Sequence, residues 1–177
     1  KDTKNALDVS AILVVDPDER IYRIFGKVLG PRYHLVFTPN SAFASTILND
    51  TFLALVFVGQ TAGGDHGLLL VRSLKAGHPS IPAIFIVKRS TPNLILSSFR
   101  AGAKDIITDP IDSEELLEMT ERVILQAAKS RMAERPRQAV PSFNLRNLWM
   151  QLRSDNHGYV KIGTIGDHKS SALKSKG

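Results

Sequence analysis

The sequence predicts an α/β domain with a five-stranded parallel sheet in the order 2-1-3-4-5, helices on both faces and a C-terminal extension. Two observations carry this prediction. Between residues 10 and 130, short apolar segments of the kind buried on both faces of a sheet recur five times. Each is followed by a stretch in which apolar residues have helical spacing. Such alternation is typical of parallel strands joined by crossover helices.

Each expected element has its own signals. The strands are expected at residues 10–15, 34–37, 52–58, 83–87 and 105–108, and the helices at residues 18–29, 41–48, 68–75, 92–101 and 112–130. Gly30-Pro31 stops the first helix, and Pro39-Asn40-Ser41 caps the second. A glycine-rich turn at 59–67 precedes the third helix. Thr91 is the expected N-cap of the fourth helix, before a proline at its first position, and Asp112 begins the expected cap of the last helix.

The predicted strand order indicates where function should be sought. In a flavodoxin-like sheet with the order 2-1-3-4-5, ligands bind at the carboxyl ends of the central strands. The sequence segments that reach this edge are 16–18, 59–61, 87–88 and 108–110. We therefore take these four segments as the candidate site.

The charge of the chain is unevenly distributed. The net charge is +6, yet residues 1–130 hold 14 Lys/Arg and 14 Asp/Glu, whereas residues 131–177 hold 9 and 3. We therefore do not expect the folded part to bind nucleic acid, despite the high pI. We expect a flexible segment at 1–9, one domain at 10–130 and a basic linker or tail at 131–177. Alternating residues at 159–162 predict a strand in this tail, which could be the start or a part of a second small module.

Composition excludes several classes of protein. The chain has no cysteine, so a disulfide scaffold and cysteine-ligated metal are excluded. No apolar run reaches the ~18 to 20 residues of a membrane span, which predicts no membrane partner and a cytoplasmic location. No Ser-His-Asp order or metal-ligand spacing is present, so we expect neither an enzyme nor a bound cofactor.

Four segments resemble bacterial receiver domains, the family of the chemotaxis response regulator. They are 12–16 with the following Asp18, the Gly64-Asp65-His66-Gly67-Leu68 loop, the strand at 81–86, and Ala101-Gly102-Ala103 with the strand up to Asp109-Pro110. The resemblance covers residues 10–130. It implies a switch in which carboxylates after the first strand hold a divalent cation and an aspartate after the third strand accepts a phosphoryl group. A hydroxyl after the fourth strand and a lysine after the fifth then bind the phosphate.

The residues at these functional positions differ from the family pattern. The phospho-accepting position falls on Gly59, the hydroxyl on Val87, the lysine on Asp109 and the second acidic residue on Pro17. The aromatic residue that reports the switch is replaced by Ile106. Residues 53–61 contain no Asp or Glu, so a small shift of the alignment supplies no nucleophile.

These replacements predict an empty phosphorylation pocket. Asp16 and Asp18 are the remaining candidates for Mg²⁺, but without a carboxylate at Gly59 we favour an electrostatic role for Asp18 at the N-terminus of the first helix. Asp109 could restore a cation site or form an ion pair with Lys88 or Arg89, and the sequence favours the ion pair.

We therefore expect a non-phosphorylatable pseudo-receiver that acts by protein–protein interaction, with a protein partner or as a homodimer. The expected surface joins the helix at 92–101, the strand at 105–108 and the last helix. Its candidate residues are Pro92, Asn93, Leu96, Arg100, Lys104, Ile106 and Glu115. Two alternatives remain open: control of an attached effector, enzymatic or nucleic-acid-binding, that is absent from this chain, and an atypical receiver that is phosphorylated.

Overall fold

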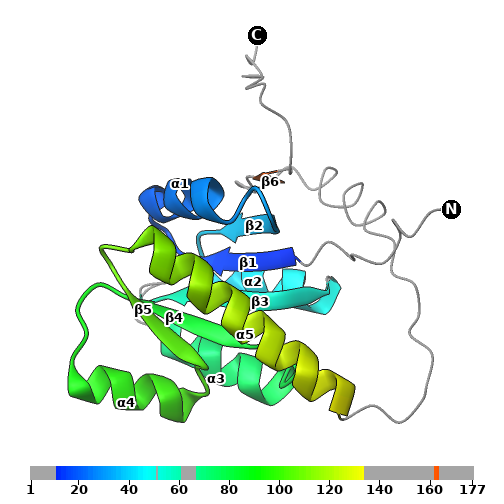
Figure 1. Ribbon diagram of the computed structural model, residues 1–177. Helices are drawn as coiled ribbons and strands as arrows, with labels where there is room; N and C mark the ends of the chain where they lie inside the picture. The colour runs from blue at the N-terminus through cyan, green and yellow to red at the C-terminus, as the bar shows by residue number, and fades with distance from the viewer. Residues whose placement is uncertain (1–10, 51, 61–66, 134–161, 164–177) are drawn as a thin grey trace, which may run out of the picture.

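The computed structural model describes residues 11–50, 52–60, 67–133 and 162–163 (Figure 1). Its sheet has the strand order β5-β4-β3-β1-β2-β6, with all neighbours parallel except β6. The strands are β1 (Ala11–Val15), β2 (His34–Thr38), β3 (Leu53–Gly59), β4 (Ala83–Val87), β5 (Asp105–Thr108) and β6 (Ile162–Gly163). The predicted parallel order 2-1-3-4-5 is confirmed, and the ends of these five strands differ from the prediction by at most one residue.

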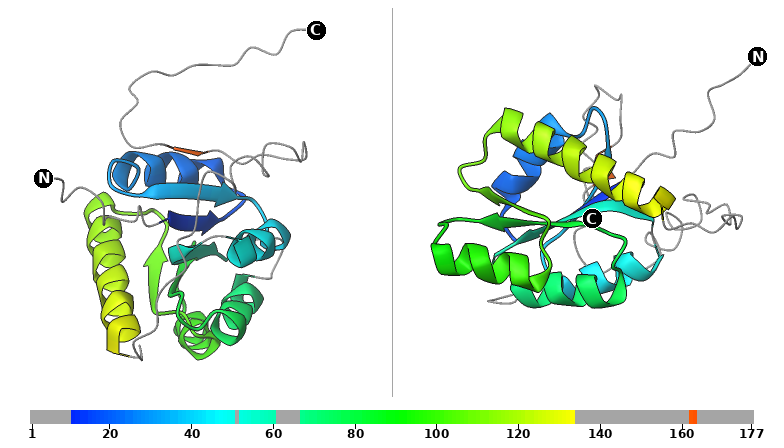
Figure 2. Two further views of the ribbon diagram at one scale, coloured as in Figure 1. Left: turned by 90° about the vertical axis from the view of Figure 1, so that its right-hand side faces the viewer. Right: turned by 60° about the horizontal axis from the view of Figure 1, so that its bottom comes forward.

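The helices form one layer on each face of the sheet (Figure 2). They are α1 (Glu19–Val28), α2 (Ser41–Asp50), α3 (Gly67–Gly77), α4 (Pro92–Ala101) and α5 (Ser113–Ala133). Side chains of α2, α3 and α4 pack in one buried cluster, and those of α1 and α5 pack in the other. The two clusters are separated by the sheet, as expected for parallel strands that are covered on both sides.

Successive side chains of the central strands point alternately into the two buried clusters. In β1, Leu13 and Val15 face the α2–α3–α4 side, whereas Ile12 and Val14 face α1 and α5. Phe25 from α1 meets Phe57 from β3 edge to face, with ring centroids 4.7 Å apart. Both rings are fully buried, and burying each is worth about 1.5–3 kcal/mol. The centre of the sheet is therefore a rigid platform for the loops at its edge.

Polar side chains fix the helix starts that flank the site. The Asp18 carboxylate accepts a hydrogen bond from the Arg20 backbone N–H at the start of α1. Thr91 does the same for Leu94 at the start of α4, and Asp112 accepts from two backbone N–H groups of α5. Each cap satisfies donors that a helix start leaves without partners. The predicted capping roles of Thr91 and Asp112 are confirmed.

The sixth strand is a difference from the expected sheet. Ile162 and Gly163 pair antiparallel with Val36 and Leu35 at the outer edge of β2. The sequence predicted a strand at 159–162, of which 159–161 lie outside the described residues.

Within the described ranges, no helix combines the length and apolarity needed to cross a membrane.

Candidate functional site

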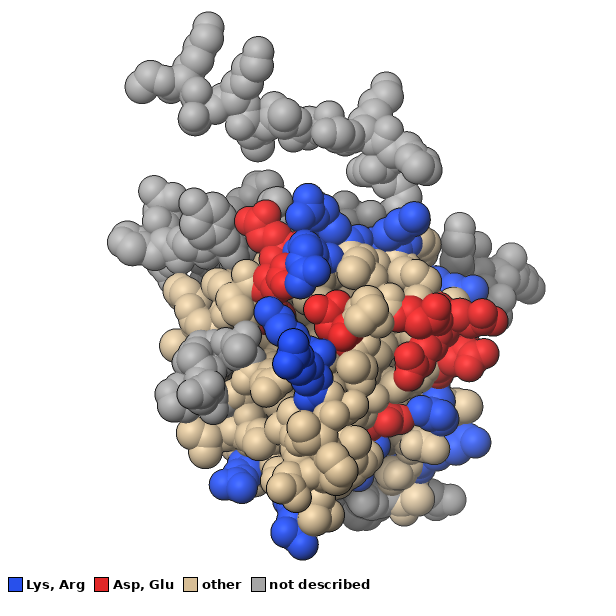
Figure 3. Space-filling model, turned by 90° about the vertical axis from the view of Figure 1, so that its left-hand side faces the viewer, with Lys and Arg blue, Asp and Glu red and all other residues tan. Residues whose placement is uncertain are grey.

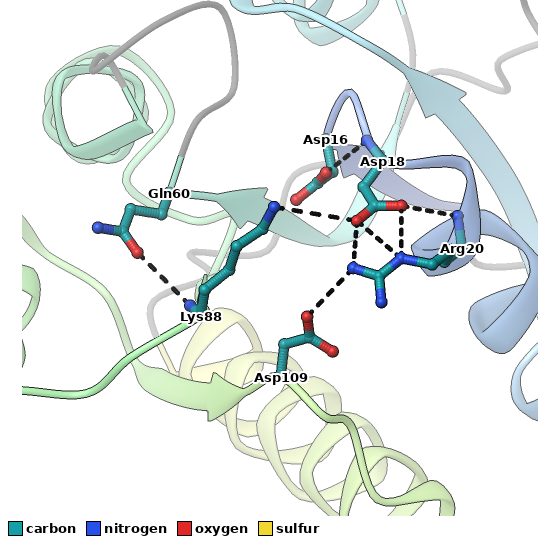
Figure 4. Close-up of polar contacts among 6 residues, drawn as sticks. All are labelled: Asp16, Asp18, Arg20, Gln60, Lys88 and Asp109. Atoms are coloured by element: carbon teal, nitrogen blue, oxygen red, sulfur yellow. Dashed lines mark hydrogen bonds and ion pairs between the residues drawn. The ribbon is translucent and has the colours of Figure 1, made fainter.

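The predicted site residues come together at the carboxyl edge of the sheet (Figure 4). Asp16 follows β1, Gly59 ends β3, Val87 ends β4 and Asp109 follows β5. Parallel strands bring these ends to one edge, which is why residues far apart in the sequence meet here. Of the predicted set, Pro17 is exposed to solvent and Val87 is fully buried.

Asp16 is a buried carboxylate, with 4% of its surface exposed. Its Oδ1 accepts a hydrogen bond of 2.7 Å from the backbone N–H of Asp18. Removal from water raises the pKa of Asp16 above its ordinary value, and the nearby charges of Asp18 and Asp109 raise it further. The backbone hydrogen bond and Lys88 oppose this effect. The Asp16 side chain is therefore packed at the end of the sheet and is shielded from solvent.

The side chain of Asp16 fills the space next to Gly59. A Cβ atom built on Gly59 would lie 2.7 Å from Cγ of Asp16, and closer still to Oδ2. Real Cβ atoms essentially never come within 3.0 Å of such neighbours, so any side chain at 59 requires Asp16 to move. Glycine at this position thus does more than remove a nucleophile, because it makes room for another carboxylate.

Arg20 lies between two of the acidic residues. Its Nη2 is 2.6 Å from Oδ2 of Asp18 and 3.5 Å from Oδ2 of Asp109 (Figure 4). The hydrogen bond from Arg20 is the main reason why the pKa of Asp18 lies below its ordinary value. The same contacts raise the pKa of the Arg20 guanidinium. One arginine thus joins the start of α1 to the end of β5.

The expected ion pair of Asp109 is corrected by this contact. Among the described residues, Asp109 pairs with Arg20, whereas Lys88 Nζ lies 4.0 Å from Oδ2 of Asp18. The reason is geometric, because Arg20 lies in the first turn of α1 and its side chain extends to the end of β5. The backbone N–H of Lys88 donates a hydrogen bond of 3.5 Å to Oε1 of Gln60. Sequence reasoning missed Arg20, and the excess of acidic residues at this edge was the available signal that a cation was needed.

Tyr22 ties the β1–α1 connection to the sheet. Its hydroxyl donates a hydrogen bond to the backbone carbonyl of Asp16, and its ring packs against Phe37 with centroids 4.6 Å apart. Partial burial raises the pKa of Tyr22 to about 12, with Asp16 and Glu19 adding to the effect. The hydrogen bond from Tyr22 fixes the backbone carbonyl of Asp16 at the start of the β1–α1 connection.

The geometry does not fit a divalent cation. Hard cations such as Mg²⁺ need several oxygen ligands with favourable geometry. Here the Asp16 carboxylate is buried beside Gly59, and Asp18 and Asp109 share the guanidinium of Arg20. Across residues 11–50, 52–60, 67–133 and 162–163, no three His, Cys, Asp or Glu side chains form a group that could hold a metal ion.

The face that contains this edge carries both signs of charge. Figure 3 shows Lys and Arg side chains in a band across it, with Asp and Glu side chains next to the band. The predicted surface residues are exposed on α4, at the α4–β5 connection and on α5: Pro92, Asn93, Leu96, Arg100, Lys104 and Glu115. Ile106 differs, because it is half-buried and packs against the α2–α3–α4 core.

The parallel sheet order and the acidic group at the end of β1 define a receiver-type α/β module. The response regulator receiver domain family matches residues 12–121, which is more than half of the chain. The chain belongs to this family. A receiver domain is a signalling module of two-component systems and is not itself a catalyst.

Curated relatives are longer than this chain. The alginate biosynthesis transcriptional regulatory protein AlgB of Pseudomonas putida is 28% identical over 106 residues, which cover 59% of this chain and 24% of AlgB. The two-component response regulator ORR2 of Oryza sativa is 28% identical over 131 residues, covering 73% of this chain and 48% of ORR2. The chain thus spans less than half of the length of these relatives.

Solved structures agree with the fold. The receiver domain of NtrX from Brucella abortus has a TM-score of 0.60 and 27% identity, covering 64% of this chain and 98% of that domain. A receiver domain of an HD domain-containing protein from Pseudomonas fluorescens has a TM-score of 0.66 and 23% identity, covering 70% and 92%. Neither likeness covers more than 70% of this chain.

Proposed function

We propose that residues 10–130 form a pseudo-receiver that is not phosphorylated and that signals by binding a protein partner or a second copy of itself. The observation that carries this proposal is the position of Asp16, whose carboxylate fills the space beside Gly59. A receiver needs a solvent-accessible carboxylate at the end of β3. Here the carboxylate beside that position is Asp16, which follows β1 and is buried.

The other phosphate-binding positions support the same conclusion. Val87 is fully buried and has no group that can donate a hydrogen bond to a phosphoryl oxygen. Asp109 carries a negative charge where a lysine would pair with phosphate, and this charge is held by Arg20. A bound phosphoryl group would meet Asp109 at close range, and like charges repel strongly in a partly desolvated site.

The internal contacts also replace the charges that phosphate and metal would supply. Arg20 bridges α1 and the end of β5, so the edge is neutralised by a residue of the chain itself. In a phosphorylated receiver, the added charges bias a two-state element. We infer that in this chain the contacts of Arg20 keep the corresponding element in one of its two states. A phosphate donor is then not required for signalling.

The proposed binding surface is the α4–β5–α5 face. Leu96 has 48% of its surface exposed, and it lies among the exposed Pro92, Asn93 and Arg100. An apolar side chain surrounded by polar ones is the usual composition of an interface centre and rim. Ile106 is better placed to support this surface from below than to contact a partner. Signalling of this type would take place in the cytoplasm.

The test compares two apolar-to-acidic variants. Tagged protein in which Leu96 is replaced (Leu96→Glu) should lose the partner or copy that wild type retains in affinity purification and sedimentation velocity. Leu69→Glu, which makes the same change at an exposed position of α3, should retain it. Retention should be the same with and without a small phosphodonor and Mg²⁺. Binding that depends on the phosphodonor would contradict the proposal.

A second candidate function is control of an attached effector. It is favoured by the relatives, since this chain spans only 24% of AlgB, a transcriptional regulatory protein, and 48% of ORR2. In this case residues 131–177 are a basic linker between the domain and a further module. Activity of the full gene product, measured with and without residues 10–130, would separate the two candidates.

A further inference from the structure

A second surface lies away from the candidate site, between the carboxyl ends of α3 and α4. It contains a cavity of about 310 Å³ next to the amino end of β4. In Figure 1 α3 and α4 run side by side below the sheet, and the cavity residues come from both helices. Its buried floor includes Val71, Leu74 and Ala83. This volume is at the lower end of ligand pockets, about 300–1,000 Å³, and suits one or two side chains.

The apolar wall of the cavity continues onto exposed helix surface. Phe99 lines the cavity with 46% of its surface exposed. Ile95 and Leu96, one turn or less before it on α4, are also exposed apolar residues. Residues four apart lie on the same side of a helix, so Ile95 and Phe99 form a strip that leads into the cavity. Contiguous exposed apolar surface of this kind marks interaction sites.

Among the residues that the structure describes, Lys75 and Lys104 are the charged side chains that line the cavity, and none of the described Asp or Glu residues lines it. Lys75 packs against Gly102, the C-cap of α4, which has a φ of +114°. A Cβ on Gly102 would lie 2.9 Å from Cβ of Lys75, so the absence of a side chain there lets the lysine stem pack across the end of α4. Lys75 and Lys104 are both exposed. Because a lysine stem packs over apolar surface while its ammonium group stays in water, we take both charges to lie at the rim of the cavity.

These features together select the chemistry of an occupant. An apolar floor calls for a bulky apolar side chain, and two lysines at the rim call for carboxylates beside it. The chain's own residues 131–177 are a poor match, because they carry 9 Lys/Arg and only 3 Asp/Glu. We propose that the α3–α4 cavity binds a segment of a partner protein in which one bulky apolar side chain is flanked by acidic residues. This inference stands whether or not the candidate site is phosphorylated.

The experiment selects peptides on the whole chain. A displayed library of random peptides is enriched on wild-type protein, and the affinities of the selected peptides are then measured on variants. We expect the selected peptides to carry a bulky apolar residue next to Asp or Glu. We also expect Lys75→Met, which keeps the stem but removes the charge, to weaken their binding about tenfold or more. Phe99→Ala should weaken it by a similar factor.

The control is Arg72→Met, which removes a positive charge from an exposed position on the same helix without touching the cavity lining. It should leave affinity unchanged, and thermal unfolding should show that all variants fold. Failure to enrich any peptide, or selected peptides without acidic residues, would overturn the proposal. Equal binding of the peptides to wild type and to Lys75→Met would also overturn it. Self-association of the chain that Lys75→Met abolishes would do the same, because the occupant would then be a second copy.

Discussion

The Asp16 carboxylate occupies the space that a side chain on Gly59 would need, with Cγ of Asp16 only 2.7 Å from the position of a Cβ at 59. Asp16 follows β1 and Gly59 ends the neighbouring β3, so their relationship is fixed by the register of these two strands. It links the loss of a nucleophile at one position to the burial of a carboxylate at the other. The predictions below follow from this pair and from Arg20 beside it.

Gly59→Ala should destabilise the protein by about 1–3 kcal/mol, because the added methyl group forces Asp16 out of its place. The free energy of unfolding, measured in urea, checks this. In an Asp16→Ala background the same substitution should cost much less, so the double-mutant cycle should show coupling of about 0.5–3 kcal/mol. Gly26→Ala is the control: nothing lies within 4 Å of its added Cβ, and it should stabilise α1 by up to about 1 kcal/mol. Strictly additive costs at 16 and 59 would refute the steric relationship.

Asp16→Asn should stabilise the protein at neutral pH. Because the pKa of Asp16 is raised in the folded state, its favourable contribution is complete below its ordinary pKa and is lost as the pH rises through the raised value. Asparagine can still accept the backbone N–H of Asp18 and carries no charge. The advantage of Asp16→Asn should therefore disappear as the pH is lowered, in urea unfolding measured across the acid range.

Asp18→Asn should behave in the opposite way. The lowered pKa of Asp18 means that its contribution is present above its ordinary pKa and is lost as the pH falls through the lowered value. The substitution should therefore destabilise the protein at neutral pH and have little effect in acid. Asparagine is nearly as good a helix cap as aspartate, so the capping of α1 is preserved. If both Asn variants shift stability in the same direction at pH 7, the assignment of the two pKa directions is wrong.

Arg20→Gln should raise the pKa of Asp18 towards its ordinary value. The side-chain hydrogen bond from Arg20 contributes most to the lowered pKa of Asp18, whereas the charge of Lys88 contributes least. Carbon-detected NMR titration of the carboxyl group should therefore show a larger change for Arg20→Gln than for Lys88→Gln. The pH dependence contributed by Asp18 at acid pH should become shallower at the same time. A larger effect of Lys88→Gln would mean that Arg20 is a solvent-exposed side chain without a role at this edge.

Much of the fold could be predicted from the sequence because its signals are local. Buried-type strands alternate with capped helices, and the order of the parallel strands follows from this repetition. The two-residue β6 could not be placed in the sheet, since an edge pairing of Ile162 and Gly163 depends on distant backbone and not on their own pattern. Its partner residues in β2 carry no sequence feature that selects them.

The site was predicted in position but not in its contacts. The sequence identified Asp16, Gly59 and Asp109 as neighbours, because they follow strands whose ends meet. It did not identify Arg20 as the partner of Asp109, since the two are 89 positions apart and the pairing depends on the orientation of the first turn of α1. It also could not show that Asp16 turns towards Gly59, because side-chain direction depends on the packed surroundings.

Gly59→Asp alone should not create a phosphorylatable domain. The new carboxylate would compete with Asp16 for one space, and Asp109 would remain where a positive charge is needed. We expect no phosphoryl transfer to this variant, and a further loss of stability because two carboxylates would be desolvated together. Phosphorylation of Gly59→Asp at a rate typical of receivers would show that glycine at 59 is the only obstacle. The replaced residues at 87 and 109 would then have no influence on the reaction.

The central claim is that the wild-type domain cannot accept a phosphoryl group. Its most direct test is to incubate the chain with acetyl phosphate and Mg²⁺ beside a phosphorylatable receiver domain as a positive control, and to measure intact mass. We predict that the control gains the mass of one phosphoryl group and that this chain does not. A stoichiometric acyl phosphate on any aspartate of residues 10–130, lost on treatment with hydroxylamine, would contradict the account.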